Sequence, residues 1–163
     1  MKIRLISLVA LLATVLAAPV FAASFAQLSS TETQKATTTP QIVTLNSNDG
    51  SKGIDNNKGK VTIKEAGSYF LMAAGQIGGT GKGTVRLWMR QNGKDIDNSN
   101  TEQYLTDPTS TTVLVCQGVA EAKRGDKFEV VFSGSDPSVG VVVKKPMGEP
   151  VVPSIIFSAW RID

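Results

Sequence analysis

The stretch SYFLMAAGQI at residues 68–77 decides the fold, because it is apolar on both of its alternating faces. In an extended strand, successive side chains point to opposite sides of the sheet. One side here carries Tyr69, Leu71 and Ala73, and the other carries Phe70, Met72 and Ala74. A strand of this kind predicts a sheet that is covered on both faces.

Two later stretches repeat the two-sided pattern. In residues 111–121, Leu114 and Cys116 oppose Val113, Val115 and Val119, and in residues 154–162, Ile155, Phe157 and Ala159 oppose Ile156, Trp160 and Ile162. Residues 84–91 and 127–133 instead alternate between an apolar and a mostly polar side. This contrast predicts one sheet that is buried on both faces and a second sheet that faces water.

The rest of the chain favours an all-β domain. No stretch keeps apolar residues at helical spacing over three turns, whereas short β-branched runs alternate with turn formers. The expected strands are residues 25–33, 41–45, 59–63, 68–77, 84–91, 111–121, 127–133, 139–144 and 154–162. Expected turns include Asn48-Asp49-Gly50, Asn92-Gly93 and Gly125-Asp126.

One face of the two-sided sheet has no expected cover from within the chain. The second sheet covers one face, and no helix is expected that could cover the other. Another copy of the chain is the simplest remaining cover. The residues expected at this interface are Phe70, Met72, Ala74, Val113, Val115, Ile156, Trp160 and Ile162.

Four segments resemble a known family when they are taken in order. They are GSYF at 67–70, RQNG at 90–93, RGDKF at 124–128 and the closing SIIFSAWRI at 154–162. Together they are similar to complement-1q and tumour-necrosis-factor-like domains. The resemblance implies a jelly-roll β-sandwich of about ten strands in two antiparallel sheets, and a homotrimer with its inner sheet at the three-fold axis. Ala159 departs from the glycine that is frequent there.

The amino terminus reads as a signal peptide over residues 1–22. Lys2 and Arg4 precede an apolar run to Ala18, and Val20 and Ala22 suit signal peptidase. Residues 23–163 would then be the complement-1q-like domain, a stand-alone head of bacterial type without a collagen-like stem, secreted outside the cell or into the periplasm.

We expect the exported protein to begin at Ala23. Intact-mass measurement checks this, and a mass that retains residues 1–22 would contradict it.

Charge argues against a nucleic-acid partner. The chain has 17 Lys and Arg against 14 Asp and Glu, and two of the basic residues leave with the signal peptide. The remaining chain is close to neutral, which gives no support for nucleic-acid binding. No segment after the signal peptide is apolar enough for membrane insertion.

The sequence contains few of the residues that catalysis commonly uses. The chain has no His and a single Cys, Cys116, within an apolar run, so His-based triads and thiolate metal clusters are excluded. The glycine-rich residues 78–84 lack the phosphate-loop pattern and are expected to connect two strands. We expect no catalytic residue, no cofactor and no enzymatic activity. The carboxylates considered as a glycosidase pair are Glu65, Glu102, Glu121, Glu129 and Glu149.

Three weaker sites follow from local patterns. Trp88 is expected on a water-facing side between Arg86 and Arg90, which is typical of a ligand-binding patch. Asp95 and Asp97 loosely resemble a calcium loop without its central glycine. Residues 124–126 spell Arg-Gly-Asp, which we interpret as a tight turn rather than an integrin motif.

The expected function is therefore a secreted homotrimeric recognition or scaffold module that binds an unidentified extracellular protein or glycan without catalysis. The alternative from another class is a carbohydrate-active jelly roll, either a glycan-binding module or a minimal glycosidase.

Overall fold

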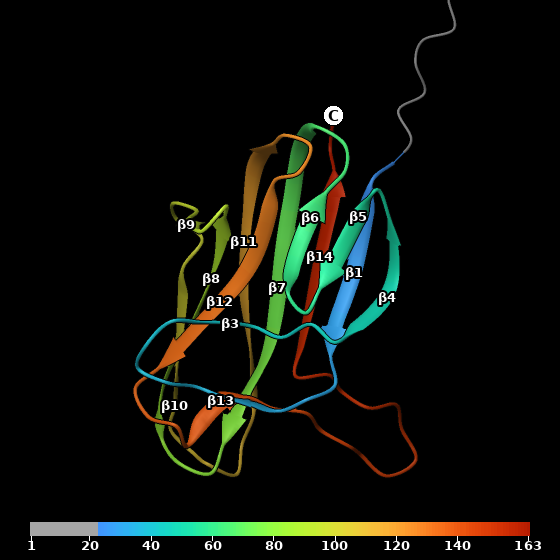
Figure 1. Ribbon diagram of the computed structural model, residues 1–163. Helices are drawn as coiled ribbons and strands as arrows, with labels where there is room; N and C mark the ends of the chain where they lie inside the picture. Colours follow the sequence, from blue (N-terminus) through green and yellow to red (C-terminus); the bar gives the residue numbers. More distant parts are fainter. Residues whose placement is uncertain (1–22) are drawn as a thin grey trace, which may run out of the picture.

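A computed structural model describes residues 23–163 of the chain. The described residues form a sandwich of two antiparallel sheets and contain no helix (Figure 1). Within this part of the chain no helix could therefore cross a membrane. The signal peptide expected at residues 1–22 lies outside the described residues.

The first sheet is centred on β7 (Gly67–Gly79), the decisive stretch of the sequence. β11 (Thr112–Ala122) pairs along one of its edges, and β14 (Ile155–Arg161) and β13 (Val139–Val141) pair along the other. Beyond these strands, β1 (Phe25–Ser30) pairs with β14, β4 (Ser47–Lys52) pairs with β1, and β2 (Gln34–Lys35) pairs with β13.

The second sheet is built around β8 (Gly83–Gln91) and β12 (Lys127–Gly134), which pair with each other. On the far side of β8 lie β9 (Lys94–Asp95) and β10 (Thr101–Leu105). On the far side of β12 lie β3 (Gln41–Ile42) and β6 (Lys60–Ile63), and β5 (Ile54–Asn57) pairs with β6.

The core lies between the sheets and contains the residues that alternation assigned to it. Tyr69, Leu71, Phe157 and Cys116 face inward from the first sheet, and all are at most 1% exposed. Phe128 faces them from the second sheet, and its ring centroid lies 6.5 Å from that of Tyr69. The Tyr69 hydroxyl donates a hydrogen bond to the Glu65 carbonyl oxygen, so the buried phenol is satisfied. The all-β, two-sheet prediction is confirmed.

Several boundaries differ from the sequence-based expectation. The expected turn Asn48-Asp49-Gly50 is wrong, because these residues lie inside β4 and pair with β1. Strands β5 and β10 were not expected, and the strand predicted at 139–144 ends at Val141. Gly78 and Gly79 belong to β7, so the connection to β8 is shorter than predicted. In each case pairing with a neighbour fixes the strand, and composition alone does not report pairing.

The Arg-Gly-Asp segment is a turn, as expected. Gly125 has a φ of 92°. Asp126 accepts hydrogen bonds from the Lys123 backbone N–H, the Gln91 amide and the Asn92 amide, at 2.9–3.0 Å. The hydrogen bond from Lys123 has the largest effect on the pKa of Asp126, which it lowers, and the hydrogen bond from Asn92 lowers this pKa further. The turn is thereby fixed to the neighbouring hairpin between β8 and β9.

Replacing Gly125 with Val is expected to lower the free energy of unfolding by about 1–2 kcal/mol, because a β-branched residue is strained at positive φ. No heavy atom lies within 4 Å of the added Cβ position, so the cost is conformational rather than steric. Arg124→Ala is the control, with an expected change within about 0.5 kcal/mol. Urea denaturation measures both, and equal losses would contradict the turn interpretation.

Candidate functional site

The outward side of the first sheet carries two apolar rows. In the first row Val119, Phe70, Trp160 and Phe25 lie opposite one another across β11, β7, β14 and β1. In the second row Val115, Ala74 and Ile156 lie opposite one another. We call this surface the apolar face; its members are Phe25, Phe70, Met72, Ala74, Val113, Val115, Val119, Ile156, Trp160 and Ile162.

The first row is exposed and preorganised. Trp160 is 40% exposed, Phe25 43% and Val119 57%. The rings of Phe70 and Trp160 lie 4.7 Å apart between centroids at an interplanar angle of 35°, so each ring holds the other in place. Soluble monomers rarely leave contiguous apolar side chains of this size in water, and such patches commonly mark interaction sites.

A polar row separates the two apolar rows. Gln117, Ser158 and Gln27 lie opposite one another on either side of Met72. The face therefore combines apolar contacts with hydrogen-bonding groups, as protein interfaces generally do.

All eight residues predicted at the interface occupy the outward side of the first sheet or its extension beyond β14. The prediction omitted Phe25 and did not include Val119 in the interface set. Phe25 could have been found from the apolar alternation of β1, where Ala26 and Leu28 are buried and Phe25 faces the other way.

Hydrogen bonds and ion pairs fix the end of β14 next to the apolar face. The Arg161 Nε donates to the Asp163 carboxylate at 2.7 Å, and the second oxygen of Asp163 accepts the Ser68 backbone N–H at 3.0 Å. The hydrogen bond from Arg161 lowers the pKa of Asp163. Glu65 lies 3.9 Å from the same guanidinium and accepts a hydrogen bond from the Ser24 hydroxyl. These contacts connect β1, β7 and β14 at the end where Trp160 lies.

The expected exposure of Trp88 is wrong. Alternation placed its side chain on the outward side of the second sheet, but the residue is only 7% exposed. Its indole N–H donates to Asp95 at 2.8 Å, and the Arg90 guanidinium lies 5.7 Å from the ring centroid. Arg86 pairs instead with Glu102 at 2.6 Å. The face of the indole is therefore already occupied by side chains of its own chain.

The calcium suggestion at Asp95 and Asp97 gains no support from the contacts. Asp95 pairs with Arg90 at 2.6 Å, and hydrogen bonds from Arg90 and then Trp88 lower its pKa. Asp97 is exposed. Among residues 23–163 no group of three or more His, Cys, Asp or Glu side chains could hold a metal ion.

Three of the five carboxylates considered for glycoside hydrolysis have other partners. Glu65 and Glu102 contact arginines, and Glu121 accepts a hydrogen bond from the Ser68 hydroxyl at 2.6 Å. Glu129 faces Arg90 across the β8–β12 ladder, and Glu149 is exposed in the loop between β13 and β14.

The described chain is thus a jelly-roll sandwich with an uncovered apolar face. Among solved structures it is similar to the globular domain of zebrafish complement 1qA protein, with a TM-score of 0.53 and 17% identity over 86% of this chain and 97% of that one. This likeness shows the fold. No protein-family model matches the chain, and no curated protein matches it.

Proposed function

We propose that residues 23–163 form a secreted, non-enzymatic recognition module that associates as a homotrimer through the apolar face. The exposed row of Val119, Phe70, Trp160 and Phe25 carries the proposal, because it would stay in water in a monomer. The complement-1q-like fold supports a recognition role for the module. The number three rests on the family resemblance, since a dimer would cover the same face.

The free energy gained by covering the apolar face is large enough to support association. A buried aromatic hides about 150–250 Å². Trp160 is still 40% exposed, so covering the rest contributes up to roughly 2.5 kcal/mol at about 25 cal/mol per Å². With Phe25, Phe70 and the valines of β11 in every copy, the sum reaches the range that offsets the entropy of association.

The mechanism would be multivalent binding. Each copy offers the same loops at the same end of the sandwich, so a ligand that repeats on a surface engages several copies at once. Once one copy is bound, the others bind at high effective concentration, which raises avidity without any new contact. The expected partner is an extracellular protein or a glycan.

Sedimentation equilibrium of the mature protein at micromolar concentration tests the proposal. We expect a single species of three times the chain mass. A monodisperse monomer would overturn the interface, and a dimer would overturn the choice of three.

A further inference from the structure

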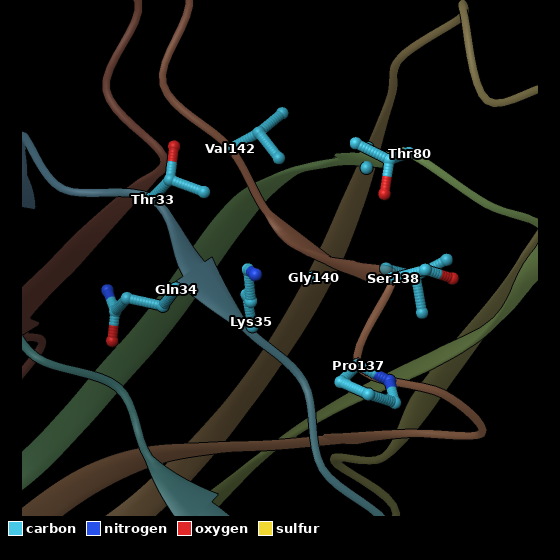
Figure 2. A pocket seen from close by; sticks show the side chains of 11 residues that line it. Thr33, Gln34, Lys35, Thr80, Pro137, Ser138, Gly140 and Val142 are labelled. Atoms are coloured by element: carbon cyan, nitrogen blue, oxygen red, sulfur yellow. The ribbon is translucent and has the colours of Figure 1, made fainter.

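A hollow of about 200 Å³ lies beside the last residues of β7, between that strand, β13 and β2. In Figure 1 this is the end of the sandwich opposite the C-terminus, and Figure 2 shows the lining side chains. The first apolar row includes Phe70, near the other end of β7, so the hollow is separate from that row.

Two polar side chains of the lining have no partner within residues 23–163. The Lys35 ammonium forms no ion pair and the Thr80 hydroxyl forms no hydrogen bond there, whereas the Ser138 hydroxyl is hydrogen-bonded to the Asp136 carboxylate. Gln34 differs, because its amide already bonds Ser30 and Thr44. The lining thus separates into groups with structural partners and groups that are available to a ligand.

Lys35 is the only ionisable side chain among the described residues that line the hollow. No lining carboxylate competes for it. The remaining lining is mostly apolar or glycine, and its accessible apolar side chains are Pro137 and Val142, because Val139 is buried in the core. A cation beside a free hydroxyl and an apolar wall is suited to a ligand that carries one negative charge on a compact, partly hydroxylated body.

Glycine lets the three backbones that line the hollow approach one another closely. A Cβ at Gly79 would lie 1.9 Å from the Ser138 carbonyl oxygen, and one at Gly140 would lie 2.2 Å from the Gln34 carbonyl oxygen. The three backbones approach so closely that side chains are excluded at both positions. The lining is therefore built on paired strands, which favours a preformed site.

We infer that this hollow binds an acidic monosaccharide unit, a sugar ring with a single carboxylate such as a uronic acid. Lys35 would pair with the carboxylate, Thr80 with a ring hydroxyl, and Pro137 with an apolar edge of the ring. The inference rests on the proposed recognition function and names its ligand class. The volume of about 200 Å³ falls between an engineered cavity of about 150 Å³ that holds benzene and the roughly 300 Å³ at which drug-sized pockets begin.

An extended peptide fits the hollow less well. Both edges of β13 are already paired, with β7 and with β2. A peptide could add only at the outer edge of β2, which is two residues long. A single sugar ring needs only the side-chain groups that are present.

Titration of the ¹⁵N-labelled mature protein, followed by amide chemical shifts, tests the site. The probes are sodium glucuronate, glucose as its neutral counterpart and the dipeptide Ala-Ala as a carboxylate of another class, all at equal ionic strength. We expect glucuronate to shift the amides of Gly79, Thr80 and Ser138 saturably, and glucose to bind at least fivefold more weakly.

Two variants and one control test which side chains of the lining bind glucuronate. Lys35→Gln should weaken glucuronate binding roughly tenfold, as expected for loss of a charged hydrogen-bond partner. Thr80→Val should weaken it roughly threefold. Lys82→Gln removes a nearby exposed lysine outside the lining and should leave binding unchanged.

Three results would overturn the assignment: no saturable shift up to roughly 50 mM glucuronate, equal binding to wild type and Lys35→Gln, or Ala-Ala binding as tightly as glucuronate. Sedimentation of the same samples reports self-association separately. Loss of sugar binding in an intact trimer would overturn this inference alone, and binding by a monomer would overturn only the trimer.

Discussion

Replacing Trp160 with Asp is expected to convert the proposed trimer into folded monomers. Trp160 lies within the first apolar row, with Phe70 stacked on one side and Phe25 opposite it on the other. A carboxylate at this position would have to lose its hydration in the interface without a partner. Central aromatic residues typically cost about 2–4 kcal/mol when they are removed from an interface. With three copies per assembly, dissociation at micromolar concentration follows, and sedimentation equilibrium measures it.

A second variant separates dissociation from unfolding, since Trp160 also packs against Phe70 within its own chain. Val119→Asp changes a residue on β11 that is 57% exposed, so it costs less folding stability and should still dissociate the trimer. Tyr104→Asp is the control, because Tyr104 is 52% exposed but belongs to β10 in the other sheet. An assembly that survives both Trp160→Asp and Val119→Asp would exclude the apolar face as the interface. Dissociation by Tyr104→Asp would mean that the interface lies elsewhere.

Trp88 is not a suitable control, although alternation predicts an exposed side chain there. The indole is buried and donates a hydrogen bond to Asp95. Trp88→Asp would place a second carboxylate beside the first and is expected to destabilise the second sheet.

Cys116 in the native protein is expected to react about a thousandfold more slowly with thiol reagents at pH 8 than it does in the unfolded chain. The residue is fully buried between the sheets, and this burial raises the pKa of its thiol from 9.0 to about 12. The thiolate is the reactive form, and its fraction at pH 8 falls from roughly one in ten to about one in ten thousand. Timed labelling with a chromogenic disulfide, with and without urea, measures the reaction rates of the unfolded and the native protein. Rapid labelling of the native protein would contradict the core assignment.

The raised pKa of the Cys116 thiol also predicts how the free energy of unfolding changes at alkaline pH. The folded state holds the Cys116 proton to a higher pH than the unfolded state, so stability decreases as the pH rises above about 9 and continues to fall towards 12. Cys116→Ala removes this dependence. A free energy of unfolding that declines equally in both proteins between these values would show that another group causes the loss.

Alternation predicted the first sheet well because burial on each face leaves a mark in the sequence. Leu114 and Cys116 are buried, and Val113 and Val115, which alternate with them, are exposed, as the pattern of β11 indicates. The turn at Gly125 was equally readable, since few residues accept a positive φ. These features are local, and each depends on a few neighbouring residues.

The missed features depend on contacts between distant segments. β4 reads as a turn from its composition and becomes a strand only because β1 offers it hydrogen bonds. Trp88 lies on the side of its strand that alternation assigned, but its indole is buried and bonds Asp95 of β9. The hollow beside Lys35 left no pattern at all, because β2, β7 and β13 come from widely separated parts of the chain.

The polar edge strand β4 has a consequence for solubility. A free sheet edge can template the addition of further chains and so lead to fibres. Here one of the edge strands of the first sheet has the sequence SNDGSK, and a register shift between Gln27 and Leu28 of its partner interrupts the regular ladder. Such an edge is a poor template for another strand. At this side of the sheet a second copy is therefore hindered from adding strand to strand, which opposes the growth of a ribbon there.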